Sequence, residues 1–135
     1  MKKVGLVAFL VLVFMACVGM GGLGGPARIS VPEPSKDYVA TITDQADVTS
    51  RVHKLSCEGQ TAISGELGSG HVSIGFDKIA SIEFVLAGDV IRAHVALKDG
   101  KRVTLAVDKA VSWFGKLPYG DFKIATEAIR SIEFH

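Results

Sequence analysis

The strongest constraint on the fold is an internal repeat at an offset of fifty residues. The segment "DKIASIEF" at 77–84 recurs as "EAIRSIEF" at 127–134. Across 61–84, nine residues are identical to those fifty positions later: Gly65, Leu67, Gly70, Ile74, Ile79, Ser81, Ile82, Glu83 and Phe84. Self-similarity without a gap indicates two copies of one supersecondary unit. Two units are too few for a solenoid, so we expect them to pack around an approximate two-fold axis.

Apolar and polar residues alternate across 90–107, which predicts a β-hairpin around Asp99-Gly100. A two-residue turn would place Leu97 opposite Arg102 and put one of them on the wrong face. A three-residue loop at 98–100, with Gly100 left-handed, keeps one face apolar. That loop predicts three opposed pairs: Ile91 with Val107, Ala93 with Leu105, and Val95 with Val103.

The two "SIEF" segments are expected to be the closing strands of the two units. Their apolar residues should point inward and their glutamates outward: Ile82, Phe84, Ile132 and Phe134 against Glu83 and Glu133. A single helical turn, capped by Asp77 or Thr126, is expected before each strand. The sequence therefore predicts an all-β domain over 38–135, with units at about 38–86 and 88–135, that closes into a compact sandwich or small barrel.

Three motifs in the second unit carry a resemblance. "DGK" at 99–101 is followed by "GxxPYGxFxI" from Gly115 and by a closing "IxxIEF" from Ile129. The pattern resembles that of uncharacterised exported bacterial β-proteins and, more distantly, Sm-like small barrels. It covers 98–134 well and 61–84 in part. Sm-like barrels have a further strand before the closing segment, which is not evident in this sequence. The resemblance implies an all-β fold and no active site.

The first seventeen residues have the layout of an export signal. Lys2 and Lys3 precede an uncharged apolar run from Val4 to Ala16, and small residues follow. Because no charge occurs from Val4 to Ala27, an uncleaved membrane anchor also fits. Under both interpretations the lysines stay in the cytoplasm and the rest of the chain crosses the membrane.

The junction "FMAC" resembles a lipobox, the site at which bacterial lipoproteins are cleaved and acylated on cysteine. Ala16 fits that pattern well, whereas Phe14 and Met15 replace the usual Leu and small residue. The resemblance implies lipidation of Cys17. Ordinary cleavage and an uncleaved anchor are the alternatives.

Residues 18–37 are rich in Gly and then in Pro, which predicts a tether between the anchor and the domain. Loss of residues 1–16 removes only Lys2 and Lys3 from the charged residues, which leaves 13 basic and 14 acidic. This near-neutral balance argues against nucleic acid as a partner, because such binding requires several phosphates to be neutralised at once.

Cys57 and four histidines are the residues most suggestive of nucleophilic or metal chemistry. The offset of fifty matches Cys57 with Val107 and Leu55 with Leu105, which predicts that both face the core. A buried thiol has a raised pKa and reacts poorly. His53 and Cys57 lie four residues apart on a predicted strand, about 13 Å, too far to share a metal ion. We expect no metal and no cofactor.

Glu83 and Glu133 form a second possible site, because a two-fold axis could bring the two carboxylates together for acid–base catalysis. The simpler interpretation is that each lies on the wet face of a half-buried strand.

The matching positions in the two units also suggest a binding surface. Ser64 and Ser69 in the first unit correspond to Phe114 and Tyr119 in the second. Positions that tolerate serine are expected to be exposed.

Phe114, Lys116 and Tyr119 are therefore the candidate binding surface, with packing of both rings in the core as the alternative. The function we expect is a non-catalytic binding or scaffold module, exported and lipid-anchored in the bacterial cell envelope. Its expected partners are the membrane, through the N-terminus, and an envelope protein or glycan. The alternatives are a small hydrolase that uses the glutamate pair or Cys57, and a structural homo-oligomer; the sequence leaves the oligomeric state open.

Overall fold

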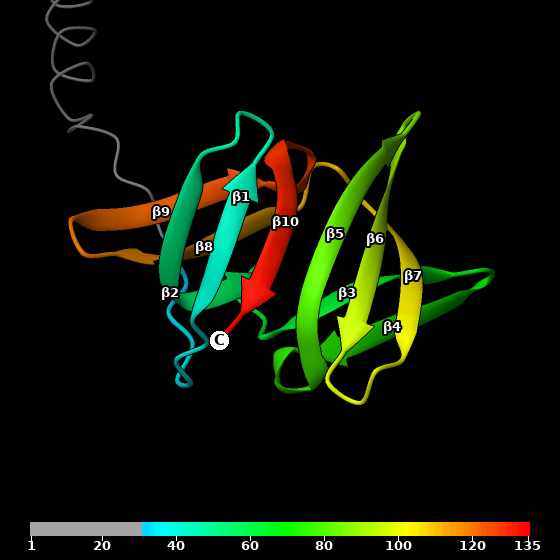
Figure 1. Cartoon of the computed structure of the whole chain (residues 1–135), viewed down its shortest axis with the longest axis horizontal. Helices are drawn as coiled ribbons and strands as arrows, with labels where there is room; N and C mark the ends of the chain where they lie inside the picture. The colour runs from blue at the N-terminus through cyan, green and yellow to red at the C-terminus, as the bar shows by residue number, and fades with distance from the viewer. Residues whose placement is uncertain (1–30) are drawn as a thin grey trace, which may run out of the picture.

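A computed structural model describes residues 31–135 (Figure 1). The expected signal segment 1–17, Cys17 and the linker as far as residue 30 lie outside the described residues. The described chain forms ten strands and two short 3-10 helices: β1 (Ala40–Asp44), β2 (Thr49–Cys57), β3 (Ala62–Leu67), β4 (Gly70–Gly75), η1 (Phe76–Lys78), β5 (Ile79–Ala87), β6 (Val90–Leu97), β7 (Arg102–Val107), β8 (Ser112–Leu117), β9 (Gly120–Ala125), η2 (Thr126–Ala128) and β10 (Ile129–Phe134).

All ten strands belong to one antiparallel sheet in the order β4-β3-β7-β6-β5-β10-β1-β2-β8-β9. In Figure 1 the central strands β7, β6, β5, β10, β1 and β2 stand side by side, and the hairpins β3–β4 and β8–β9 run across behind them. The sheet therefore curls back at both ends into a half-barrel, with the core on its concave side. The all-β prediction is confirmed, with a single curled sheet.

An approximate two-fold axis passes between β5 and β10. Ile82 lies opposite Ile132, Ser81 opposite Glu133, and Glu83 opposite Ser131. Strands β1–β5 form one repeat and β6–β10 the other, and the strand order is equivalent when read from either end. The predicted pair of pseudo-symmetric units is confirmed.

The two repeats exchange hairpins. The β3–β4 hairpin of the first repeat adds to β7 of the second, and the β8–β9 hairpin of the second adds to β2 of the first. Each half of the sheet thus contains strands from both repeats, so neither repeat forms its half of the sheet alone.

The β6–β7 hairpin has the predicted register. Ile91 lies opposite Val107, Ala93 opposite Leu105, and Val95 opposite Val103. The Leu97 amide donates to the Lys101 carbonyl at 2.8 Å across a three-residue loop, and Gly100 is left-handed with φ of 92°.

The offset between the repeats is not constant. Strand pairing matches Ala40 with Ala93 and Val52 with Leu105, an offset of 53. The prediction that Leu55 is the counterpart of Leu105 is therefore wrong, although Leu55 is fully buried as expected. Three additional residues in β2 account for the change to an offset of fifty.

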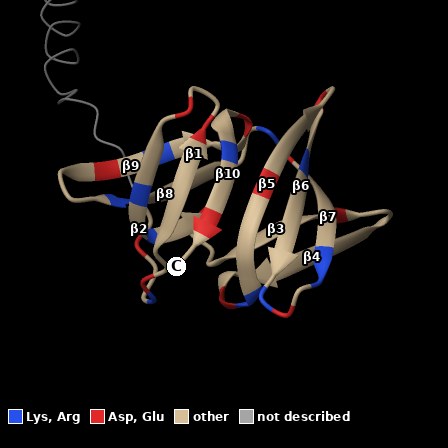
Figure 2. Ribbon diagram, viewed as in Figure 1, with Lys and Arg blue, Asp and Glu red and all other residues tan. Residues whose placement is uncertain are grey.

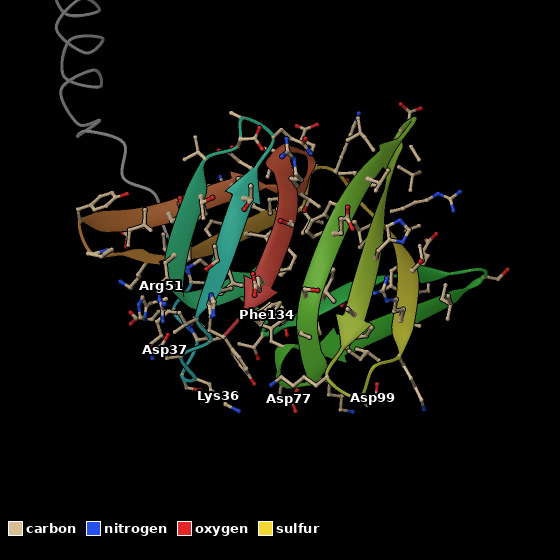
Figure 3. The ribbon with its side chains drawn as sticks, viewed as in Figure 1. Lys36, Asp37, Arg51, Asp77, Asp99 and Phe134 are labelled. Atoms are coloured by element: carbon tan, nitrogen blue, oxygen red, sulfur yellow. The ribbon has the colours of Figure 1, made fainter. Side chains whose placement is uncertain are left out.

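A bulge at Lys54 accommodates one of these additional residues, because three steps along β2 there face two steps along β8. Lys54 has a positive φ of 54°, and its amide donates to the Asp37 carboxylate at 2.7 Å. This hydrogen bond is the main reason that the pKa of Asp37 is lowered, and His53 adds to it. Figure 3 shows Asp37 beside the lower part of β2. The side chain thus stabilises a backbone conformation that non-glycine residues rarely adopt.

The core lies between the central strands and the two crossing hairpins. Ile82, Phe84 and Ile132 are buried and Phe134 packs against them, whereas Glu83 and Glu133 are exposed, as predicted. Phe76 is at the centre of an aromatic cluster, with ring centroids 5.7 Å from Trp113, 5.0 Å from Phe134 and 5.5 Å from Tyr38.

Both expected helical turns are present, at η1 and η2, but the expected caps are wrong. Gly75 and Ala125 occupy the N-cap positions and make no side-chain cap. Thr126 instead donates its hydroxyl to the Val111 carbonyl at 2.7 Å and accepts the Trp113 indole N–H at 3.0 Å. A hydrogen bond to a buried indole N–H contributes more to stability than a cap on a three-residue helix would.

Two equivalent glycines lie where the exchanged hairpins meet the central strands. A Cβ on Gly65 would lie 2.8 Å from the Ala106 carbonyl oxygen, and a Cβ on Gly115 would lie 3.0 Å from that of His53 and collide with the Val52 side chain. Only glycine permits this approach of the backbones, which explains why the repeat retains it in both copies.

We predict that Gly115→Ala lowers the free energy of unfolding by about 1–3 kcal/mol, because the added methyl overpacks the contact with Val52. Gly120→Ala is the matched control in the same hairpin, since its Cβ would meet open space. Urea denaturation of both variants measures the difference. Equal stability of the two would contradict the proposed close approach.

Candidate functional site

The expected binding surface on the β8–β9 hairpin is only partly exposed. Tyr119, at the turn, is 85% exposed. Phe114 is 9% exposed, so the expectation that it lies on the surface is wrong. The two rings therefore do not share one exposed patch.

The additional residues of β2 explain the burial of Phe114. The bulged end of β2 runs on beside β8, so that Ser56 lies opposite Phe114, and the Lys123 ammonium lies 5.7 Å from the ring centroid. The equivalent Ser64 of β3 lacks such a neighbour, because β3 pairs with β7 only at Glu66. The two copies thus pack differently at this position.

Lys116 is engaged within the domain. Its ammonium lies 3.5 Å from the Asp121 carboxylate and 3.7 Å from that of Glu33. Glu33 belongs to the described part of the expected linker, 31–37, which packs on the domain through Pro32 against Gly59 as well. The chain therefore enters the sheet alongside β2 and β8.

Glu83 and Glu133 lie on the convex face at the two-fold axis. Acidic segments of β5 and β10 are visible there in Figure 2. The two carboxylates are diagonal neighbours across the β5–β10 pair, a geometry that separates side chains by about 7–8 Å. A groove of about 640 Å³ runs over this seam, lined by Ser81, Glu83, Ser131 and Glu133, with Lys98 and Arg130 at its margins.

Each glutamate has a threonine and a histidine beside it. Glu83 lies opposite His94 on β6, whose Nδ1 is 2.9 Å from the Thr104 hydroxyl. Glu133 lies opposite Thr41 on β1, whose hydroxyl is 2.6 Å from His135 Nε2. The convex face therefore presents two similar sets of hydrogen-bonding groups.

This arrangement places several hydrogen-bonding groups on one surface. Carboxylates that act as general acid and base are commonly tuned by burial and by their neighbours. Glu83 and Glu133 are exposed in an open groove on a sheet surface. Hydroxyls, carboxylates and imidazoles at such a surface can form hydrogen bonds with a polar ligand or partner.

Cys57 lies in the core, as predicted. It is 8% exposed and pairs with Trp113 on β8. Burial raises the pKa of its thiol to about 12, and the nearby Glu58 adds to the shift. Because the thiolate is the reactive form, the thiol is a poor nucleophile at neutral pH. The His53 imidazole contacts Asp37, with 3.4 Å between His53 Nδ1 and Asp37 Oδ2.

Two negative findings apply to residues 31–135 only. No group of three or more histidine, cysteine, aspartate or glutamate side chains in this part is arranged to hold a metal ion. Within the same range, no helix has the length and apolar character required to cross a bilayer.

The polar partners of the two glutamates could not be identified from the sequence. Alternation placed Glu83 and Glu133 on the wet face, but it gives neither the register of β5 against β6 nor the pairing of β10 with β1. His94 alternates with core residues in 91–97, which indicated its exposure and not its neighbour.

Comparison with known proteins gives a family and no function. A family described as "Uncharacterised protein" matches residues 34–135. The chain belongs to this family. The match begins at Pro34, within the segment that packs beside β2, and includes both repeats. It agrees with the resemblance to uncharacterised proteins, whereas the Sm-like pattern and the lipoprotein-type signal stay predictions. No curated protein and no solved structure matches the chain.

We predict that Phe114→Ser lowers the free energy of unfolding by about 2 kcal/mol or more, because it removes a buried ring. Tyr119→Ser, five residues away on the same hairpin, should change it by less than about 0.5 kcal/mol. Chemical denaturation of the two variants tests this contrast. A stable Phe114→Ser protein would show that burial of this ring contributes nothing to stability.

Proposed function

We propose that the protein is a non-catalytic binding module of the bacterial cell envelope, exported and held at a membrane by its N-terminus. The observation that carries the proposal is the order of features at that end. Two lysines, an uncharged apolar run and the "FMAC" junction at Cys17 precede a folded domain. This order is typical of a lipoprotein or an anchored exported protein.

The features of the domain support a binding role and not a catalytic one. Its cysteine is buried with a pKa raised to about 12, and its paired glutamates are exposed. The groove over the β5–β10 seam and the exposed Tyr119 offer hydrogen bonds and an aromatic contact to an envelope protein or glycan. The near-neutral charge of the mature chain argues against nucleic acid.

The anchor is tested in cells that produce the full chain. A labelled fatty acid should be incorporated into the wild-type protein, which should sediment with membranes. Cys17→Ser should lose the label, because it removes the only proposed acceptor thiol, and Cys57→Ser should keep it. Absence of label from the wild type, or equal labelling of Cys17→Ser, would refute lipidation.

The partner is tested by crosslinking in intact cells followed by isolation of the full chain. Tyr119→Ser should reduce a crosslinked partner at least several-fold, because this ring is the most exposed large apolar side chain of the domain. Leu86→Ser is the control, since it removes a side chain that is 61% exposed on the β5–β6 hairpin. Equal loss in both variants would count against a specific surface at Tyr119.

A further inference from the structure

The two ends of the sheet, β4 and β9, are equivalent strands with different edges. Each has a hydrogen-bonded neighbour on one side only. Free strand edges promote pairing with other chains, and proteins often block them with charged side chains. β9 carries Asp121 and Lys123, whereas β4, with the sequence GHVSIG, carries neither Asp, Glu, Lys, Arg nor Pro.

The groups on the free edge of β4 follow from its pairing with β3. The Phe76 amide, just after β4, donates to the Thr61 carbonyl. In an antiparallel ladder, alternate residues direct both N–H and C=O to the same side. Val72 and Ile74 therefore bond to β3. His71, Ser73 and Gly75 direct their backbone groups outward.

We propose that this edge pairs with the same edge of a second copy of the chain, antiparallel and centred on Ser73. In that register Ser73 faces its own counterpart, and His71 faces Gly75 of the second copy. Every outward N–H and C=O on both strands then has a partner. Val72 lies opposite Ile74 of the second copy, so the apolar face of the sheet continues across the interface.

A polar side-chain contact supports the same register. The Asp77 carboxylate occupies the position that a side chain on Gly75 would take, on the face that also carries His71 and Ser73. His71 of each copy would therefore lie next to Asp77 of the other. Figure 3 shows Asp77 at the lower end of the sheet, where β4 ends. The contact occurs twice, as a two-fold interface requires.

An apolar groove adjoins the edge. It has a volume of about 290 Å³ and includes Leu67, which is 51% exposed, with Val72, Leu97 and Val103. The second copy would extend the sheet beside this groove with its own Val72 and Ile74. Burial of this surface adds a hydrophobic contribution to the backbone hydrogen bonds.

The equivalent edge of β9 disfavours such pairing. Lys123 occupies the position of Ser73, so self-pairing in the same register would bring two lysines together. Asp121, at the position of His71, is already engaged with Lys116 at 3.5 Å. The molecule thus has one edge suited to self-association and one protected edge, which produces a closed dimer instead of a filament.

The test uses the full chain in detergent or in membranes. Opposed residues of a hydrogen-bonded antiparallel pair have Cα atoms about 5.5 Å apart, which suits a disulfide. Ser73→Cys should therefore give a disulfide-linked dimer under mild oxidation, at least tenfold more than wild type, which retains Cys17 and Cys57. Ser69→Cys, which is exposed in the β3–β4 turn but lies far from its own counterpart in this register, should remain at the wild-type level.

A second variant tests the dimer without an added thiol. Ser73→Lys gives β4 the residue that β9 already has at this position, so the strand should fold and the dimer should dissociate at least tenfold more readily in sedimentation equilibrium. The proposal is overturned if Ser73→Cys fails to crosslink, if Ser69→Cys crosslinks equally, or if Ser73→Lys leaves association unchanged. None of these outcomes depends on the envelope partner.

Discussion

The close backbone contact between exchanged hairpins and central strands is the constraint on which the rest of the structure depends. Gly115 on β8 lies against Val52 and the His53 carbonyl, and Gly65 on β3 lies against the Ala106 carbonyl. These contacts turn the sheet ends behind the central strands and enclose the core. A side chain at either glycine would push the hairpin outward and open the concave face where Trp113 and Phe76 stack. Curvature of the sheet and burial of the aromatic cluster thus both require this close approach.

The equivalent pairs β5–β6 and β10–β1 show that side-chain packing, and not chain connectivity, sets the register. β5 and β6 are joined by a hairpin, with Phe84 opposite Ala93. β10 and β1 lie at the two ends of the described fold, yet Phe134 lies opposite Ala40 in the equivalent register. Because a slip of one residue would turn every core residue outward, the apolar faces alone are sufficient to align these strands.

Much of the fold was predictable because it depends on local alternation and on an internal copy. The β6–β7 register followed from Gly100 and the apolar face of 91–97, and the inward side chains of the closing strands followed from their alternation. The exchange of hairpins was not predictable, since β3 carries the same pattern whether it pairs with β2 or with β7. The bulge at Lys54 was also hidden, because its partner Asp37 lies 17 residues earlier in a segment without periodicity.

The same bulge explains why the candidate surface was only partly predicted. Comparison of the repeats assumes that equivalent residues have equivalent surroundings, and this holds for Ser69 and Tyr119, which are both exposed. It fails for Ser64 and Phe114, because the three additional residues of β2 extend its contact with β8. That extension has a cost, since the buried Ser56 hydroxyl lacks a hydrogen-bond partner among the described residues.

The differences between the repeats are concentrated at the sheet ends. The seam retains Ser81, Glu83 and their copies Ser131 and Glu133, because both sides of a two-fold axis must fit each other. The ends have no such constraint. The end formed by β2, β8 and β9 has a longer strand contact, a buried Phe114 and a charged edge strand, whereas the edge strand β4 at the other end carries no Asp, Glu, Lys or Arg. The two copies are therefore most alike at the centre of the sheet and differ at its ends, so that one repeated unit provides two edge strands with different surfaces.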